Sequence, residues 1–382
     1  MPNAFKSSVA AGLVCGMLAV IASSCASRST DGRVPNYYPA DYNDTLAKAE
    51  KIGQLLIWST TDRAQIADAL SAFERKYPKI RVQYREMRAR NIYAWFLRDL
   101  HDGRPTADLL LSSAMDMQIK LVNDGYAATY KSPEREHLAS WANWKNQAWG
   151  VTAEPIVFLS NRSALPPNNV PRSHLEFRKM LEAGPALDKR VVSYDPSESA
   201  FGYLILSQDE MASPDVWRTI RGLGERNARF HPTTKALINE VATGQAALAY
   251  NVLGSYAADA ASRDPNLQVT VPDDYTLVAS RIALIPARAP HPDGAALFLD
   301  FLLSREGQLA LRKHHLPSVR NDIRPPKDLD LTDANERAIR VGPALLVLQD
   351  QMTRRHFLSR WENSVRAGKG FAPIEVADTL PN

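Results

Sequence analysis

Apolar residues recur along the chain with two periods, and each change of period marks the end of one predicted element and the start of another. A short apolar run at residues 54–58 has the length of a buried strand, and residues 66–73 place apolar side chains at helical spacing. Residues 80–84 alternate as a half-buried strand does, residues 92–100 return to helical spacing, and residues 107–111 form another buried strand that a helix follows. This regular order of strand and helix predicts a parallel sheet covered by helices.

The second half of the chain repeats this plan, and helices dominate after residue 286. The predicted strands are 149–160, 190–194, 246–250 and 276–286. The predicted helices are 200–211, 214–220, 233–241, 293–303, 336–349 and 352–365. The fold class is therefore α/β, and 382 residues are enough for two domains.

The first 24 residues have the pattern of a signal peptide. Lys6 precedes an apolar run at 9–22 that is too short for a comfortable membrane span. The segment Ala22-Ser-Ser-Cys25 resembles the lipobox of bacterial lipoproteins, so we predict lipidation at Cys25; cleavage after a small residue without lipidation is the alternative. Residues 25–44 are polar and rich in turn-forming residues, which predicts a tether.

Composition and charge exclude several classes of protein. The formal net charge of +4 becomes 4 − 1 = +3 when Lys6 leaves with the signal peptide, and we find no basic stripe with interleaved aromatic residues. We therefore predict no nucleic-acid binding. The only cysteines are Cys15 and Cys25, so the globular part contains neither a disulfide framework nor a cysteine-based metal site.

Motifs for catalysis and for metal binding are also missing from the sequence. It contains no nucleophile elbow, zinc-binding His-Glu-x-x-His helix, P-loop or dinucleotide glycine motif, so we predict neither an enzyme nor a cofactor. His314 and His315 are adjacent, and adjacent side chains diverge on a helix. We therefore predict that they lie at a surface helix end and hold no metal.

The stretch 244–257 has the order of strand, short polar turn and helix start. In α/β proteins this arrangement binds ligands, because free backbone N–H groups and the helix dipole point out of the turn. Four side chains lie in or beside the predicted turn, and we predict that they contact a small ligand. They are Tyr250, Asn251, Ser255 and Tyr256.

Polar turns follow three other predicted strands and add further candidate binding residues. These candidates are Ser59, Thr60 and Thr61 after the first strand, Ser112 and Ser113 after the third, and Asp195, Ser197 and Ser199 after the strand at 190–194. Hydroxyl and N–H groups at converging helix N-termini can hold phosphate or carboxylate without a metal. For each residue alone a helix cap is the favoured interpretation, but four such turns around one cleft favour binding.

Two charged residues interrupt otherwise apolar strands. Arg281 lies within the run 276–286 and is either a cation that contacts the ligand or one partner of a salt bridge between domains; both interpretations stay open. Glu154 lies in the run 149–160, and we expect it to pair with a nearby arginine.

Several segments, taken in order, resemble one protein family. They are Lys51-Ile-Gly-Gln-Leu-Leu-Ile-Trp-Ser-Thr-Thr-Asp62, the segment 73–82, Ala107-Asp-Leu-Leu-Leu-Ser-Ser113, the stretch 244–257 and Phe298-Leu-Asp-Phe-Leu-Leu-Ser-Arg-Glu-Gly-Gln308. Together they are similar to the extracellular solute-binding proteins of bacterial ABC importers. The similarity is to the cluster that includes binders of ferric iron, phosphoglycerate, hexose phosphates and aminoethylphosphonate, and it spans residues 38–361.

The resemblance implies a type II periplasmic-binding-protein fold, in which two α/β lobes are joined by two hinge strands and close on a solute. We expect the crossing strands near 152–161 and 276–286. Lobe one would comprise 45–153, lobe two 154–274, and 275–382 would return to lobe one through the hinge strand. The amphipathic terminal helix, with Phe357 and Trp361 in the core, would then pack on lobe one.

The resemblance also implies a function. We expect a monomeric periplasmic protein, lipid-anchored if Cys25 is acylated, that delivers a small anionic solute to an ABC permease. Ferric iron is an alternative cargo, but the iron-binding relatives place two adjacent tyrosines where this chain has only Tyr256, and the turn at 59–61 contains no histidine. A solute sensor that reports to a histidine kinase is a second alternative.

Overall fold

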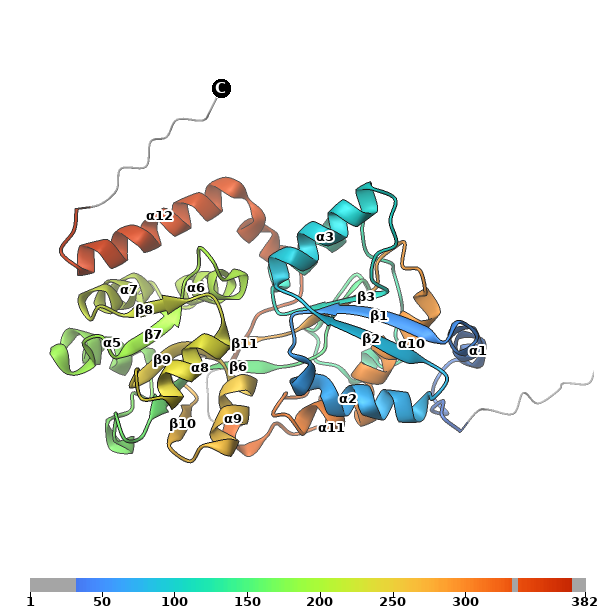
Figure 1. Cartoon of the computed structure of the whole chain (residues 1–382), viewed down its shortest axis with the longest axis horizontal. Coiled ribbons are helices and arrows are strands. Elements are labelled where there is room, and N and C mark those ends of the chain that lie inside the picture. Colours follow the sequence, from blue (N-terminus) through green and yellow to red (C-terminus); the bar gives the residue numbers. More distant parts are fainter. Residues whose placement is uncertain (1–31, 332–335, 373–382) are drawn as a thin grey trace, which may run out of the picture.

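The computed structural model of the protein describes residues 32–331 and 336–372 and contains two α/β lobes, each built on its own sheet (Figure 1). Lobe one contains the described chain up to about residue 150 together with residues 282–312, and it lies on the right of Figure 1, whereas lobe two lies on the left. The expected two-lobed α/β architecture is therefore confirmed.

The sheet of lobe one has the strand order β2-β1-β3-β12-β5-β4. These strands are β1 (Gln54–Ser59), β2 (Arg81–Glu86), β3 (Leu109–Ser112), β4 (Asn143–Trp144), β5 (Ala148–Gly150) and β12 (Ile282–Leu284). β1 pairs in parallel with both β2 and β3, as the alternation of strand and helix predicts, whereas β12 is antiparallel to β3. The helices of this lobe are α1 (Tyr42–Ile52), α2 (Arg63–Lys76), α3 (Ala89–His101), α4 (Met115–Asn123), α10 (Pro292–Leu303) and α11 (Arg305–Arg312).

The sheet of lobe two has the order β13-β11-β6-β9-β7-β8, and β10 pairs with β6 beside this path. The strands are β6 (Glu154–Asn161), β7 (Val191–Tyr194), β8 (Arg229–His231), β9 (Leu248–Leu253), β10 (Leu267–Thr270), β11 (Thr276–Ala279) and β13 (Glu336–Ala338). The helices are α5 (His174–Glu182), α6 (Ala200–Ala212), α7 (Val216–Glu225), α8 (Thr234–Ala242), α9 (Gly254–Arg263) and α12 (Gln351–Gly368). Short 3₁₀ turns complete the described chain at η1 (Arg135–His137), η2 (Pro167–Asn169), η3 (Pro185–Leu187), η4 (Lys327–Leu329) and η5 (Pro343–Gln349).

The chain crosses between the two sheets in two segments. It leaves lobe one after β5 and enters lobe two at Glu154, and it returns between β11 and β12, where Arg281 lies. A buried hydrophobic cluster continues through both lobes, from Trp58 on β1 to Ile156 on β6 and Val252 on β9. The lobes are therefore joined by shared core as well as by covalent connections.

The N-terminal segment is docked on lobe one from the first residues that the structure describes. The Tyr37 and Tyr38 hydroxyls donate hydrogen bonds of 2.7 Å and 2.6 Å to the Glu134 carboxylate, which is fully buried and paired with Arg320. The part of the predicted tether that the structure describes is thus attached to lobe one. Cys25 and the predicted signal peptide lie outside the described residues.

The prediction of a helix at 336–349 was wrong. Residues Glu336–Ala338 form β13, which pairs in parallel with β11, and Pro343–Gln349 form η5. The edge of β11 that does not pair with β6 offers backbone hydrogen bonds to this segment. The Gly342-Pro343 pair interrupts any continuing helix because proline lacks an N–H donor.

The expected packing of the terminal helix on lobe one was also wrong. α12 lies over α7 of lobe two, as Figure 1 shows. Phe357 contacts Tyr203 and Trp217, and Trp361 contacts Phe230, with ring centroids 5.2–5.3 Å apart. The chain therefore crosses to lobe two once more after α11, a step that the local sequence pattern could not reveal.

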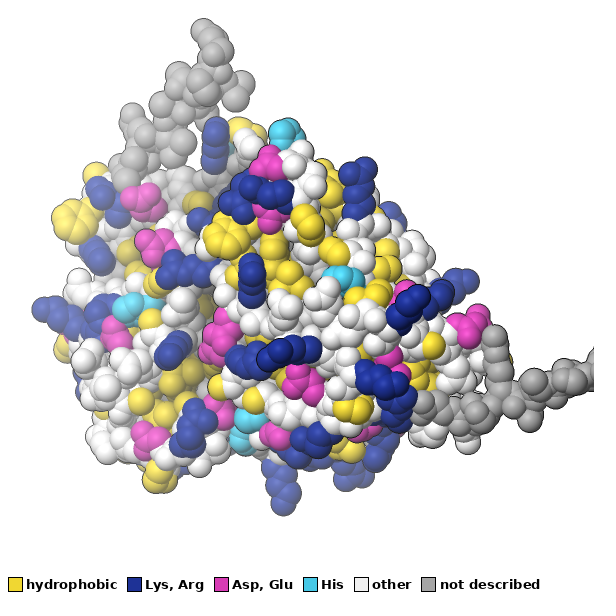
Figure 2. Space-filling view, turned by 45° about the vertical axis from the view of Figure 1, so that its right-hand side comes forward, with side chains coloured by type: hydrophobic (Ala, Val, Ile, Leu, Met, Phe, Trp, Pro, Cys, Tyr) yellow, Lys and Arg dark blue, Asp and Glu magenta, His cyan; other side chains and the backbone are white. Residues whose placement is uncertain are grey.

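The surface has a mixed charge on the face shown in Figure 2, where Lys and Arg side chains are interspersed with Asp and Glu side chains. Within the described residues, we find no helix that is both long enough and apolar enough to cross a membrane.

Candidate functional site

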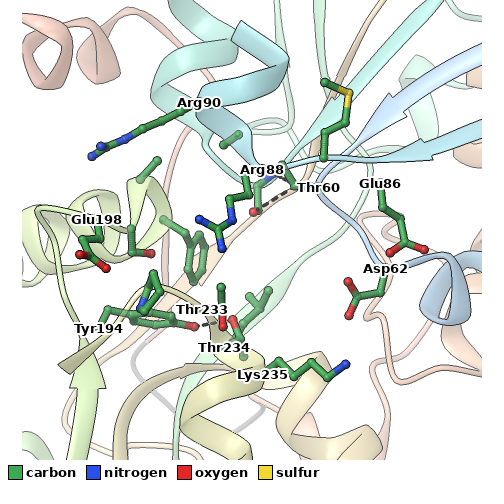
Figure 3. Close-up of a pocket in the computed structure, with 18 of the residues that line it drawn as sticks. Thr60, Asp62, Glu86, Arg88, Arg90, Tyr194, Glu198, Thr233, Thr234 and Lys235 are labelled. Atoms are coloured by element: carbon green, nitrogen blue, oxygen red, sulfur yellow. Dashed lines mark hydrogen bonds between the residues drawn. The ribbon is translucent and has the colours of Figure 1, made fainter. Parts of the chain in front are cut away.

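A cleft of about 680 Å³ lies between the two lobes, and both lobes contribute its walls (Figure 3). On lobe one, the lining residues follow β1, β2 and β3 and precede α2, α3 and α4. On lobe two, they follow β7, β8 and β9 and precede α6, α8 and α9. The carboxyl ends of parallel strands and the N-termini of several helices thus meet at one place, where backbone N–H groups and helix dipoles favour negative charge.

Five of the residues predicted from the sequence line this cleft. They are Thr60, Ser113, Ser199, Tyr256 and Arg281. Thr60 and Ser113 belong to adjacent turns of lobe one, and the Ser113 backbone N–H donates to Thr60 Oγ1 over 3.0 Å. The sequence prediction that the turns after β1, β3, β7 and β9 approach one cleft is therefore consistent with the structure.

Four other predicted residues are buried and do not line the cleft. They are Ser59, Thr61, Ser112 and Ser255. Ser59 Oγ accepts from the Thr61 backbone N–H, and Ser112 Oγ accepts from the Ala114 backbone N–H. The Ser255 hydroxyl donates to the Glu154 carboxylate. The helix-cap or turn interpretation, which the sequence left open, therefore describes Ser59 and Ser112 better than ligand binding does.

Asp195 and Ser197 form a turn at the edge of the cleft. The Asp195 carboxylate accepts from the backbone N–H and the hydroxyl of Ser197, over 2.8 Å and 2.5 Å. Ser199 lines the cleft, but its hydroxyl also caps α6 by accepting from the Gly202 backbone N–H over 3.0 Å. These residues shape the turn at the start of α6.

Tyr250 and Asn251 do not belong to the cleft. β9 continues to Leu253 and α9 begins directly at Gly254, so the predicted polar turn between strand and helix does not form. Tyr250 is 1% exposed, packs on Phe177 and donates a hydrogen bond of 2.7 Å to Asp209. Asn251 donates to the same carboxylate. Both residues therefore satisfy a buried acid in the core of lobe two.

Arg281 and Glu154 form a buried ion pair between the lobes. Arg281 Nε lies 2.7 Å from Glu154 Oε1, and the two side chains are 3% and 1% exposed. Burial by itself lowers the pKa of Arg281, but the Glu154 carboxylate more than compensates, and the pKa lies above its ordinary range. Of the two interpretations open for Arg281, the structure supports the salt bridge.

Tyr256 reaches across the cleft from lobe two. Its hydroxyl accepts from the Asp62 backbone N–H over 3.3 Å, and the Arg281 guanidinium lies 5.3 Å from its ring centroid. Burial raises the pKa of the Tyr256 phenol more than the neighbouring Arg281 charge lowers it. Tyr256 therefore stays a neutral hydrogen-bonding group at neutral pH.

Several charged residues of the cleft were missed by the sequence analysis. The cations are Arg88, Arg90 and Lys235, and the acids are Asp62, Glu86 and Glu198. Figure 3 shows Arg88 pointing into the middle of the cleft, with Asp62 and Glu86 together on one side of it. Among the residues that the structure describes, the Arg88 side chain makes neither a hydrogen bond nor an ion pair, although its backbone carbonyl accepts from the N–H groups of Asn91 and Ile92.

Two of the acids in the cleft, Glu86 and Asp62, have different surroundings. Glu86 Oε1 accepts from the Arg63 backbone N–H over 2.7 Å, at the N-terminus of α2. Burial and the charge of Glu86 raise the pKa of Asp62, while Lys235 lowers it. Glu86 is thus bonded at a helix terminus and Asp62 lies near Lys235, whereas the Arg88 side chain has no ion pair among the described residues.

Two signals in the sequence could have located these residues. The segment Glu86–Arg90 follows a predicted strand and precedes a predicted helix, so the rule applied to the other turns also applies there. Thr233, Thr234 and Lys235 follow β8, whose residues Arg229–His231 contain no apolar run and were not predicted as a strand. β8 forms because it pairs in parallel with β7.

The donor set offers no evident metal site. No group of three or more His, Cys, Asp or Glu side chains that could hold a metal is found within residues 32–331 and 336–372. The Tyr194 hydroxyl, which also lines the cleft, shares a hydrogen bond of 2.6 Å with Thr234 Oγ1. Its phenol is buried, which raises its pKa above the ordinary range.

Comparisons with known proteins agree with this architecture. The sequence model of the family described as bacterial extracellular solute-binding protein matches residues 104–338. The substrate-binding protein of the ABC transporter from Agrobacterium tumefaciens is 33% identical in sequence, with a TM-score of 0.76. That alignment covers 82% of this chain and 94% of that chain. No curated protein sequence matches the chain.

More distant solved structures share the fold. Iron-bound HitA from Pseudomonas aeruginosa is 18% identical with a TM-score of 0.67, and the alignment covers 81% of this chain and 99% of that chain. AfuA from Actinobacillus pleuropneumoniae, with fructose-6-phosphate bound, is 18% identical with a TM-score of 0.68 and coverages of 82% and 99%. The cargoes of these two proteins differ, so the shared fold does not specify a ligand.

Proposed function

We propose a cargo class for this chain, which belongs to the bacterial extracellular solute-binding protein family and is the substrate-binding component of an ABC transporter. The family is a non-enzymatic class. The proposed cargo is a small solute with a phosphate or carboxylate group, held in the interlobe cleft and delivered to the permease. The cleft volume of about 680 Å³ is in the range of small-molecule sites.

Arg88 is the observation that carries this proposal. Its guanidinium points into the cleft from the start of α3 and makes no ion pair with a described residue. A planar guanidinium binds phosphate or carboxylate through two parallel hydrogen bonds. The N-terminus of α8, with Thr233 and Thr234, lies across the cleft on lobe two, so one anion could contact both lobes.

Such a bridging contact would drive closure. A solute shifts the open–closed equilibrium only as far as it binds the closed state more tightly than the open state. An anion held by Arg88 of lobe one and by α8 of lobe two makes both sets of contacts only when the lobes are closed. The closed protein is then the form that we expect to dock on the permease.

Ferric iron is less well supported as cargo. Tyr256 is the one tyrosine at the position that the iron-binding relatives use, and its ring lies against the Arg281 guanidinium. A neighbouring positive charge repels a trivalent cation, and burial raises the pKa of the phenol. The sensor alternative would use the same cleft and differs only in the protein that recognises the closed form.

A thermal-shift screen tests the proposed cargo class. Phosphosugars, phosphonates and carboxylates should raise the melting temperature, whereas polyols and polyamines should not. Arg88→Ala should weaken binding of the best anion by roughly tenfold to a hundredfold, because hydrogen bonds to charged groups contribute about 1.5–3 kcal/mol. Arg98→Ala, on the same helix but outside the cleft lining, is the control and should bind as the wild type does.

A response to neutral or cationic solutes alone would reject the anion proposal. Export by residues 1–24 and lipidation of Cys25 also remain proposals from the sequence, which the mass of the mature N-terminal peptide would check. Family membership places the protein outside the cell or in the periplasm.

A further inference from the structure

Arg281 makes bonds to both lobes at the place where the chain crosses between them. Its Nη1 lies 2.6 Å from Thr61 Oγ1, and its Nη2 lies 3.0 Å from Gln65 Oε1, both on lobe one. On lobe two, Nε and Nη2 contact the two Glu154 oxygens over 2.7 Å and 3.0 Å. Each guanidinium nitrogen therefore already has a protein acceptor.

The bonds to lobe two hold the guanidinium in a fixed position. Thr152 Oγ1 donates to Glu154 Oε1 over 2.8 Å and accepts from the Arg281 backbone N–H over 2.9 Å. Ser255 of α9 donates to Glu154 and lies 3.2 Å from Arg281 Nη2. The Arg281 side chain is thus bonded to lobe two, while its backbone carbonyl accepts from the Val151 N–H on the lobe-one side of the crossing.

The bonds to lobe one depend on how the lobes are placed. Thr61 lies just before the start of α2 and Gln65 lies in its first turn, so both move with lobe one during any hinge motion. Both side chains are buried, at 1% and 4% exposure. Separating the lobes here would remove two acceptors from a charged group, and an unsatisfied buried donor is costly.

This network of bonds reaches the wall of the cleft, where Arg281 is one of the lining residues. Thr61 directly precedes Asp62, whose backbone N–H donates to the Tyr256 hydroxyl, and the Tyr256 ring covers the Arg281 guanidinium. The network therefore joins the two residues that meet across the cleft. Its acceptors are all protein groups, so a solute is not needed to complete it.

We propose that Arg281 is a positioning residue that sets the open–closed equilibrium of the lobes, through bonds to Thr61 and Gln65 that exist only in the closed arrangement. Arg281 then acts on solute affinity without contacting the solute, because the apparent affinity scales with the fraction of molecules in the binding-competent state. Only this consequence for affinity rests on the proposed function. The equilibrium itself can be measured without solute.

Two matched variants separate this role from a purely structural one. Thr61→Val removes an acceptor on lobe one, and Ser255→Ala removes an acceptor on lobe two. Each variant deletes one hydroxyl that is bonded to the buried Arg281 guanidinium. Both variants should lower the melting temperature. Only Thr61→Val should change the placement of the lobes, because Glu154 still holds Arg281 to lobe two in Ser255→Ala.

The interlobe distance is the readout. Spin labels at Ser71→Cys on α2 and Ser262→Cys on α9, in the chain carrying Cys15→Ser and Cys25→Ser, report the separation of the lobes without solute. We expect Thr61→Val to increase the ratio of long to short distances by about fivefold, the effect of losing one hydrogen bond of ordinary strength. Thr61→Ser keeps a hydroxyl and should restore the wild-type distribution, and Gln65→Leu should act as Thr61→Val does.

Two results would overturn the proposal. One is a wild-type distance distribution in both Thr61→Val and Gln65→Leu, which would mean that these bonds do not bias the lobes. The other is an equal shift in Ser255→Ala, which would mean that any damage to the buried network opens the protein. A failed anion screen would leave these distance measurements unaffected, so the two proposals can fail separately.

Discussion

At the scale of single residues, hydroxyl groups near the cleft divide into those that line it and those that complete the protein. Thr60 and Ser113 line the cleft, whereas the Thr61 and Ser255 hydroxyls accept hydrogen bonds from Arg281. The distinction depends on which side chain lies within hydrogen-bond distance of each hydroxyl. Arg281 is 220 positions from Thr61 in the sequence, so local spacing carries no information about this bond.

Tyr256 leads to a prediction about iron. Because Arg281 lies against its ring and burial raises its pKa, we expect no tyrosinate–iron absorption when Fe(III) is added to the purified protein. Visible spectroscopy with ferric citrate measures this, with Tyr256→Phe as the control. A red colour that disappears in Tyr256→Phe would contradict the prediction and restore iron as the cargo.

At the scale of elements, the terminal helix is fixed to lobe two by close backbone packing. A Cβ atom at Gly224 of α7 would lie 2.3 Å from the Val365 carbonyl oxygen of α12, and one at Gly368 would lie 2.1 Å from the Arg221 carbonyl oxygen. Glycine at both positions lets the two helix backbones approach more closely than any side chain would allow. The aromatic contacts of Phe357 and Trp361 then complete the interface.

Gly224→Ala should therefore destabilise the protein. The added methyl has no free space beside Val365, and overpacking of this kind costs about 1–3 kcal/mol. Gly294→Ala on α10 is a matched control, because its Cβ would meet no atom closer than 3.6 Å and alanine favours a helix. Urea unfolding of both variants measures the difference, and equal stability of the two would show that α12 is not packed on α7 in this way.

At the scale of the whole molecule, two buried acids couple the stability of the protein to pH. Burial raises the pKa of Asp116 to about 6 and that of Asp300 to about 7, and both are 1% exposed or less. Asp300 accepts hydrogen bonds from the Tyr42 and Tyr130 hydroxyls, which tie α1 and the loop after α4 to α10. Asp116 accepts from Gln349 of η5 and so connects lobe one with the C-terminal segment.

The sign of the pH dependence follows from these raised values. In the unfolded chain an aspartate titrates near 3.9, so between about pH 4 and pH 7 the folded state holds protons that the unfolded state has released. The stability gained from this difference is full below the unfolded pKa and falls as the pH rises through the folded pKa. The melting temperature should be lower at pH 8 than at pH 5, by about 3 °C or more.

Scanning calorimetry at the two pH values tests this prediction. The double variant Asp116→Asn with Asp300→Asn should have a smaller difference between pH 5 and pH 8, because neither position then titrates. Asp215→Asn, at an exposed carboxylate of the same lobe as α12, should keep the wild-type difference. An undiminished difference in the double variant would show that other groups control the pH dependence.

The sequence by itself determined the elements and their α/β order. Burial of apolar residues at period 2 or at helical spacing is a local property, so β1, α2, β2, α3 and β3 could be located from the sequence alone. It also determined the region of the site, since polar turns follow the carboxyl ends of strands that are apolar in the sequence. The strands β8 and β13 form only by pairing with strands distant in the sequence. The local pattern did not predict β8 and predicted a helix in place of β13.

Only the tertiary structure decided which polar residues are available to a solute. A serine that caps a helix and a serine that binds an anion have the same local sequence, so Thr60 and Ser59 could not be told apart. The pairing of Arg281 with Glu154, 127 positions away, and the absence of an ion pair for Arg88 among the described residues follow from the packing of the two lobes. Charge neutralisation is a property of neighbours in space, and here those neighbours come from distant parts of the chain.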